Sequence, residues 1–168
     1  MAFKALMDSL EALHAVHVEL LDAAREKQGA IIKNDIDTLN KLVQRESKLV
    51  KSVEQLNAER VQRLREWMLS LGYNVPATGV TITMSLAERY ARSAVEKESL
   101  GREKHRLRKV VDELRSQNEN NQKLLKQALQ YVNFSMDLLT ADPGDDMTYR
   151  PPEHAAAARK YNMYDFKG

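Results

Sequence analysis

Apolar residues recur at alternating steps of three and four along the first part of the chain. This spacing lines one side of an α-helix, as in coiled coils and long bundles. After it, Asn34 tolerates the left-handed backbone that ends a helix, and Asp35 is suited to cap the next one. The pattern predicts a helix over about residues 2–33, with a stripe formed by Leu6, Leu10, Leu13, His17, Leu20, Ala24 and Ile31.

The same spacing continues over about residues 36–71. Its stripe consists of Ile36, Leu39, Val43, Leu49, Val53, Leu56, Leu64, Trp67 and Leu71. Gly72 follows and supplies a C-terminal helix stop. Because the connection between the two segments is so short, we expect an antiparallel hairpin of two long helices.

Residues 73–84 break the helical pattern with Pro76 and several Thr, and we expect an ordered connector there. Ser85 and Glu88 then match a capping box, in which the Ser hydroxyl accepts from a free N–H and the Glu side chain reaches back to the Ser amide. The pattern therefore predicts a short helix over about residues 85–93.

A long third helix is predicted over about residues 95–140, ending before the acidic, Pro- and Gly-containing run at 142–146. The tail, residues 141–168, is too short and broken to form a core of its own. The predicted fold class is all-α. Residues 1–140 would form an elongated antiparallel bundle of three long helices plus one short helix, followed by a flexible, partly disordered C-terminal tail.

The composition agrees with a helical protein, since only 6 Gly, 4 Pro and 3 Phe occur among 168 residues. The 26 basic residues nearly balance the 24 acidic ones, for a net charge of +2, so no strong field favours nucleic acid or anionic lipid. Asp8 precedes any long apolar run, and we expect neither a signal peptide nor membrane insertion. The chain has no cysteine, which fits a reducing compartment, and we expect a cytoplasmic location.

Candidate catalytic chemistry is sparse. Glu11 and His14 have the Glu-x-x-His spacing of di-iron helical bundles, but such a centre needs a second pair and further carboxylates. A chance pair on a helix is the simpler interpretation, and we expect no metal site and no cofactor. No nucleophile elbow, Walker loop or dinucleotide fingerprint is present, so we expect no enzyme activity.

The run from Arg102 to Lys109 is rich in basic side chains. On a helical wheel its charged residues share one stripe, while Leu107 and Val110 lie on the opposite side. Aromatic stacking residues, which single-stranded nucleic-acid sites use, are missing. We interpret the run as the solvated face of an amphipathic helix, with an acidic protein partner as the alternative.

The last part of the third helix is apolar on two sides. A wide arc suited to packing on the first two helices contains Leu124, Leu125, Ala128, Leu129, Val132, Met136 and Leu139. Tyr131, Phe134 and Leu138 form a second stripe outside that arc, and a helix with two apolar sides needs two coverings. Either the tail, the short helix or the mate in a homodimer covers the second stripe, or it is a docking strip for a helix of another protein.

Asn118 and Asn121 lie close to apolar positions of the same helix. Buried amides can fix the register of packed helices. Direct contact with a ligand is the alternative interpretation.

Several parts of the chain match a pattern known from one family. Residues 27–39 combine an apolar pair, a small polar turn with Asp and a Leu, and Glu46 follows. Residues 118–125, Asn-Glu-Asn-Asn-Gln-Lys-Leu-Leu, are similar to an Asn-x-x-Asn-x-x-Leu-Leu helix, with Tyr149 shortly after it and Tyr-Asp-Phe at 164–166. Together these residues resemble the FlgN-type flagellar export chaperones over nearly the whole chain.

The resemblance implies a cytoplasmic chaperone that uses no ATP and holds the first and third hook-associated junction proteins before export. It also implies that the tyrosine matching Tyr149 helps to hand the complex to the cytoplasmic domain of the export gate. Family members often have Tyr-Gly there, whereas Arg150 and two prolines follow Tyr149 in this chain. The client would be gripped by the C-terminal amphipathic helix, through Asn118, Asn121, Leu124, Leu125, Ala128, Tyr131, Val132, Phe134 and Leu138.

Two other functions remain open from the sequence. A structural coiled-coil scaffold would form parallel oligomers whose size depends on concentration. A different secretion-system chaperone or export regulator would share the hairpin but bind filament-cap or rod proteins.

Overall fold

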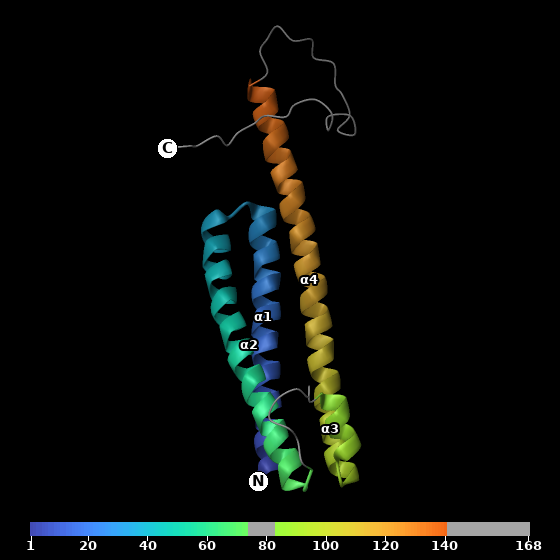
Figure 1. Ribbon diagram of the computed structural model, residues 1–168. Coiled ribbons are helices and arrows are strands. Elements are labelled where there is room, and N and C mark those ends of the chain that lie inside the picture. The colour runs from blue at the N-terminus through green and yellow to red at the C-terminus, as the bar shows by residue number, and fades with distance from the viewer. Residues whose placement is uncertain (74–82, 141–168) are drawn as a thin grey trace, which may run out of the picture. The chain divides into compact units, whose positions relative to one another are not determined.

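The computed structural model describes residues 1–73 and 83–140, and these residues form helices without a strand (Figure 1). The helices are α1 (Ala2–Lys33), α2 (Ile36–Ser70), α3 (Met84–Tyr90) and α4 (Ala94–Thr140). The all-α fold class predicted from the sequence is confirmed for this part, whereas most of the expected connector and the whole tail lie outside it. None of the helices in the described part is both long and apolar enough to cross a bilayer.

Helices α1 and α2 form an antiparallel hairpin whose turn is Asn34 and Asp35 (Figure 1). Asn34 is left-handed, with φ 54°, and its N–H donates to the Ile31 carbonyl at 3.1 Å, while the Asp35 N–H donates to the Ala30 carbonyl at 2.9 Å. The Asp35 carboxylate then accepts from the backbone N–H of Thr38 at 3.0 Å and from its hydroxyl at 2.7 Å. The first helix thus ends, and the second is capped, as the sequence predicts.

The end of α2 closes around Gly72, which has φ +85°. The Gly72 N–H donates to the Leu69 carbonyl at 2.9 Å and the Tyr73 N–H donates to the Met68 carbonyl at 3.1 Å. These two bonds form a Schellman motif, which needs a residue that tolerates positive φ. The helix stop predicted at Gly72 is confirmed.

One hydrophobic cluster joins all four helices where α1 begins and α2 ends. The Trp67 ring is 1% exposed, and its centroid lies 5.5 Å from that of Phe3. Because burial of a large apolar side chain contributes about 1.5–3 kcal/mol, this cluster anchors α3 and the start of α4 to the hairpin. Its fully buried members are Leu6, Leu10, Leu64, Trp67, Met68, Ala87 and Leu100.

Farther along α4, a polar contact joins it to α1. Asn121 is 2% exposed, and its Nδ2 donates to the backbone carbonyl of Ala24 at 2.7 Å, while its Oδ1 accepts from Gln117 at 3.3 Å. Arg25 of α1 also lies 3.4 Å from the Glu113 carboxylate. Because a buried amide is costly without its partner, the Asn121 bond fixes the register of α4 against α1.

Two ion pairs cross the hairpin. The Lys27 Nζ lies 2.6 Å from Glu46 Oε2, with both side chains less than one-fifth exposed. Arg45 and Glu26 pair at 3.3 Å in a more exposed position. These contacts lie in the half of the hairpin nearest the turn, away from the hydrophobic cluster.

The capping box predicted at Ser85 and Glu88 was wrong. The N-cap of α3 is Thr83, whose hydroxyl accepts from the Leu86 N–H at 3.2 Å. Because Thr83 already supplies a hydroxyl at this end, the helix begins at Met84 and Ser85 falls within its first turn.

A capping box does form at the start of α4. The Glu96 N–H donates to the Ser93 hydroxyl at 3.1 Å, and the Ser93 N–H donates to the Glu96 carboxylate at 3.4 Å. The Ser-x-x-Glu spacing that signals this arrangement is present in the sequence and was overlooked.

The stripe predicted for α2 was wrong at two positions of its first half, whereas Leu39 and Leu49 of the same stripe are half-buried. Ile36 and Val43 are 55% and 51% exposed, whereas Leu42 is 4% exposed. Seven residues make slightly less than two helical turns, so a row at that spacing winds gradually away from its partner. Leu42, one position earlier, is the residue that the hairpin buries.

The chain divides into two compact units, Met1–Leu129 and Gln130–Gly168. The division falls within α4. The expected division into a bundle of residues 1–140 and a tail of residues 141–168 stays a prediction. In the described part of the second unit, the hydroxyls of Ser135 and Thr140 each donate to the carbonyl four residues earlier, at 2.9 Å.

The hairpin cap predicts a pH-dependent stability. The hydrogen bonds from the Thr38 N–H and hydroxyl hold the pKa of Asp35 below its ordinary value of 3.8. The stability that this carboxylate contributes is therefore fully present above pH 3.8 and is lost as the pH falls through the lower folded pKa. Asp35→Asn keeps a capping oxygen without a titrating group, so we expect the difference in urea midpoint between wild type and variant to shrink below pH 3.8.

Asp35→Ala serves as the control for this experiment, because it removes the cap at every pH. A wild-type minus Asp35→Asn difference that stayed constant down to about pH 2 would contradict the assigned pKa shift.

Because the amide of Asn121 is buried, we predict that substitution of this one asparagine, among three neighbouring ones, lowers stability. Asn121→Ala should lower the free energy of unfolding by about 1–2 kcal/mol relative to Asn120→Ala. Asn120 is exposed on the same helix, so that variant corrects for the change in helix propensity. Chemical denaturation followed by circular dichroism measures both, and equal stabilities would show that the bond to Ala24 contributes nothing.

Candidate protein-binding surface on helix α4

The second half of α4 presents apolar side chains to solvent. Asn121 is the last buried residue of the helix in the described part of the chain. Beyond it, exposed fractions run from 37% for Leu125 to 86% for Leu139. The exposed large apolar side chains are Leu125, Leu129, Tyr131, Val132, Phe134, Met136, Leu138 and Leu139, with Ala128 also exposed and Leu124 half-buried. We call these ten residues the α4 strip.

The expectation that the wide arc of this helix is buried against the first two helices was wrong. Leu125 and Leu129, which belong to the first unit, are 37% and 63% exposed, and Val132, Met136 and Leu139 are exposed as well. The hydrophobic pattern shows which side of a helix is apolar, but it does not show whether anything covers that side. Leu129, Met136 and Leu139 therefore join the candidate surface, although their place on the wide arc predicted packing on the first two helices.

The second stripe is exposed too. Tyr131, Phe134 and Leu138 have exposed fractions of 72%, 53% and 55%. Within the described part of the second unit, these three side chains are therefore more than half exposed. The tail and a second copy of the chain lie outside the described residues.

The two asparagines expected in the client-binding set differ in their surroundings. Asn121 is buried and bonded to the Ala24 carbonyl, so its amide serves helix register and is withdrawn from the α4 strip. Asn118 is half-buried at the edge of the same surface. The register interpretation fits Asn121, and the ligand-contact expectation does not.

Charged side chains are few along the strip. After Glu119, the described part of α4 carries only Lys123, Lys126 and Asp137. The hydroxyls of Ser135 and Thr140 already donate to backbone carbonyls. A surface of this kind offers apolar area and little polar specificity, which suits an amphipathic helix of another protein.

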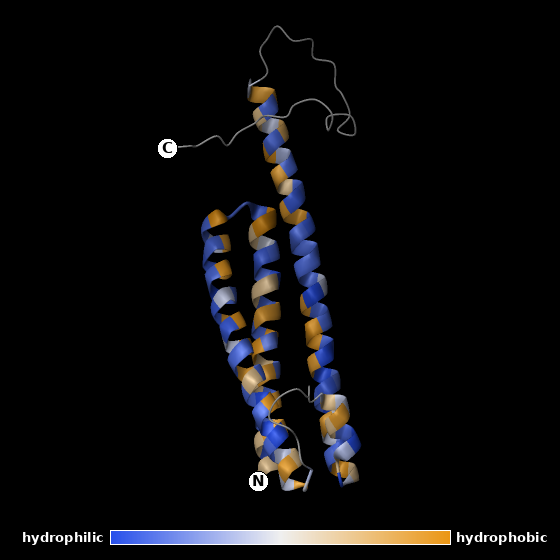
Figure 2. Ribbon diagram, viewed as in Figure 1, coloured by the Kyte–Doolittle hydropathy of each residue, from blue (hydrophilic) through white to orange (hydrophobic). Residues whose placement is uncertain are grey.

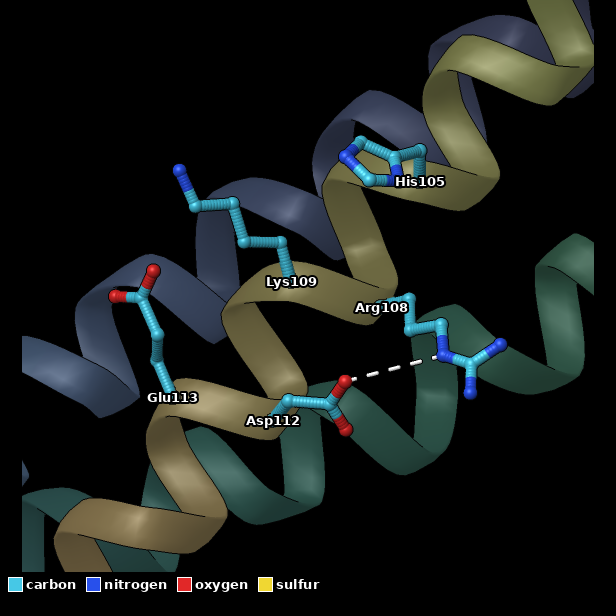
Figure 3. A pocket seen from close by; sticks show the side chains of 5 residues that line it. All are labelled: His105, Arg108, Lys109, Asp112 and Glu113. Carbon is cyan, nitrogen blue, oxygen red and sulfur yellow. Dashed lines mark ion pairs between the residues drawn. The ribbon is translucent and has the colours of Figure 1, made fainter.

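The basic run lies on an exposed side of α4, in the first unit. Figure 3 shows a shallow pocket there, lined by His105, Arg108, Lys109, Asp112 and Glu113, whose side chains spread apart rather than converge on one point. Arg108 pairs with Asp112 at 3.8 Å. Such a surface has the character of a solvated helix face.

Intramolecular ion pairs occupy much of the remaining basic run. Arg102 lies 3.2 Å from Glu98, and Arg106 lies 2.7 Å from Glu103. Lys104 reaches α3 and pairs with Glu88 at 3.0 Å, one of the contacts between α3 and α4.

The histidines of α1 do not assemble a metal centre. Among the described residues, no group of three His, Cys, Asp or Glu side chains is placed to hold a metal ion. His17, on the apolar stripe, donates from Nδ1 to the Leu13 carbonyl at 2.7 Å. It is half-buried and hydrogen-bonded within its own helix.

Tyr149, expected to dock on the export gate, lies outside the described residues. Its role rests on the sequence pattern alone.

Comparison with known proteins identifies the family. The family model described as FlgN protein matches residues 1–156. A protein of Bacillus subtilis (strain 168), named uncharacterized protein YvyG, is 29% identical over 139 residues, which cover 83% of this chain and 81% of the relative. No solved structure matches the chain. Because the family match spans most of the sequence, the chain belongs to the FlgN family, whose members have a flagellar export chaperone role.

Proposed function

We propose that this protein is a cytoplasmic type III export chaperone that binds the first and third hook-associated junction proteins before they leave the cell. The observation that carries the proposal is the α4 strip, a helical segment whose apolar side chains remain exposed beyond Asn121. Contiguous exposed apolar surface of this kind marks a protein-interaction site.

The client-binding residues are the exposed members of the strip together with Asn118 at its edge. Tyr131 and Phe134 are the anchors, because aromatic rings bury a large area at small cost in side-chain entropy. Met136 and the leucines around them adapt their shape to the facing side chains. The bound segment of the client would lie along α4 as a helix.

The chemistry of the clients explains why such a surface is needed. Their terminal segments are apolar helices that pack together in the finished junction, and in isolation they would aggregate or assemble early. The strip gives those segments a temporary apolar partner of the same kind. No cofactor or bond-breaking step is required, because exchange between two apolar surfaces is a matter of relative affinity.

Delivery to the export gate is assigned to the tail. Tyr149 follows α4 closely in the sequence, so a bound client and the gate-docking residue are carried on neighbouring segments. The cytoplasmic domain of the gate is the proposed partner of this tyrosine.

A structural coiled-coil scaffold is less well supported. Such a protein would pair its long helices with those of other copies, whereas α1 and α2 pack against each other within one chain. The Lys27–Glu46 ion pair also joins the two helices of one hairpin within a single chain.

Two charges placed in the strip test the proposal. Phe134→Asp with Leu138→Asp should weaken binding of the purified first junction protein by more than about 100-fold, because the variant loses two apolar contacts and would bury two carboxylates without partners. Calorimetric titration measures the affinity. Both residues are more than half exposed, so the helical circular dichroism should be unchanged.

A matched control carries the same charge change elsewhere. Val95→Asp with Leu69→Asp alters two apolar residues that are 72% and 50% exposed and lie outside the strip, and this variant should bind the client as wild type does. Wild-type affinity in the Phe134/Leu138 variant would refute the assignment of the strip.

The tyrosine of the tail should affect delivery and not capture. Tyr149→Ala should leave client affinity within about twofold, since it lies outside the strip, but weaken binding of the chaperone–client complex to the gate's cytoplasmic domain by at least about tenfold. Tyr164→Ala is the control in the same pull-down and calorimetric assays. Equal gate binding by the two variants would remove the proposed role of Tyr149.

A further inference from the structure

An apolar row on α2 lies outside the α4 strip and is also exposed. It consists of Ile36, Val43 and Val50, which are 55%, 51% and 47% exposed. We call it the α2 row. Figure 2 shows hydrophobic bands recurring along this half of α2, the half nearest the Asn34 turn. Residues at seven-residue spacing follow one side of a helix and suit a helical partner.

The α2 row continues a side of α2 that is buried at the other end of the helix. Five helical turns take about 18 residues, so Val50 lies on the same side as Met68, and Val43 on the same side as Val61. Met68 is 3% exposed in the cluster shared with α3 and α4, and Val61 is half-buried. Helical segments of the chain cover this side near the end of α2, and no described residue covers it near the turn.

A second row leaves the same cluster along α4. It begins at Leu100, which is fully buried, and Leu107, which packs against the cluster while half-buried. On this side of the helix follow Val111, Leu125 and Leu129, with exposed fractions of 40%, 37% and 63%. We call these last three residues the α4 row. Leu125 and Leu129 also belong to the α4 strip.

Both rows reach the same part of the first unit. The Asn121 amide bonds the Ala24 carbonyl, on the stretch of α1 that leads to the turn at Asn34. The exposed end of the α4 row therefore lies at the same position along the hairpin axis as the half of the hairpin nearest the turn, which also carries the α2 row.

We infer that the α2 row and the α4 row form a second part of the client-binding surface, covered by an amphipathic helix of the same client. The inference rests on the proposed function. Continuity selects this occupant, because Leu125 and Leu129 belong to both surfaces, and the other end of the α2 side is already covered by helix.

The test is a titration of the purified first junction protein into four chaperones. They are the wild type, the strip variant (Phe134→Asp with Leu138→Asp), the row variant (Val43→Asp with Val50→Asp) and the control (Val95→Asp with Leu69→Asp). The row variant should weaken client binding by at least about tenfold, because two half-exposed valines that become buried would be replaced by charges, while the control stays within about twofold.

The outcomes separate this inference from the proposed function. If the row variant binds as tightly as the control while the strip variant loses the client, the inference is wrong and the strip stands. If the strip variant keeps the client, the proposed function fails, whatever the row variant does.

A second measurement holds even if the Asp variants fold poorly. The chain has no cysteine, so Val43→Cys introduces a unique attachment point for an environment-sensitive fluorophore, with Leu69→Cys as the control. Addition of the junction protein should shift the emission of the Val43 label to shorter wavelength and leave the Leu69 label unchanged. An unchanged Val43 label overturns the inference.

The fluorophore at position 43 also distinguishes the client helix from the two other segments that could cover the α2 row, namely a second copy of the chain and the tail. A shift that grows with chaperone concentration alone would assign the α2 row to a second copy of the chain. A blue-shifted label that returns to the solvent-exposed value on deletion of residues 141–168, without client, would assign the row to the tail. Either result overturns the inference.

Discussion

Burial of Trp67 against Phe3 and its neighbours is the contact on which the arrangement depends, because all four helices meet in that cluster. It lies at one end of the hairpin. Farther from it, Ile36, Val43 and Val50 of α2 are about half exposed, and no residue of α4 in the described part is buried beyond Asn121. Because the one cluster shared by all four helices lies at one end, apolar sides of α2 and α4 farther along are left without full cover. The candidate binding surface is thus a direct consequence of where the core lies.

In the half of the first unit that lies far from the cluster, polar contacts act together with burial of small and medium apolar side chains such as Leu21, Ala24 and Leu42. The Lys27–Glu46 pair joins the two arms of the hairpin at 2.6 Å, and Asn121 joins α4 to the Ala24 carbonyl. Directional contacts of this kind specify register even where they add little stability. Lys27 and Glu46 also belong to the segment whose pattern resembles FlgN-type hairpins, so that part of the pattern has a physical reason.

The positions of the helices were largely predictable from the sequence, but which of their apolar sides are buried was not. The turn at Asn34 and the stop at Gly72 follow from local backbone chemistry and were predicted correctly. The α3 cap was misplaced because two hydroxyl residues two positions apart compete for the same helix end. Ile36 and Val43 of the α2 stripe and most of the wide arc of α4 were expected to be buried, and they are exposed. Periodicity identifies an apolar side, whereas burial depends on which distant segment faces it.

The backbone of α4 is already helical without a client, and this affects how a client could dissociate. The helix is continuous to Thr140, so binding carries no cost of ordering its backbone. A client held mainly by apolar contacts, with few charged groups around it, can be displaced by a partner that binds the same side chains more tightly. Under the proposed function, in which the client is released to a permanent neighbour, many moderate contacts along one helix serve better than a few strong polar ones.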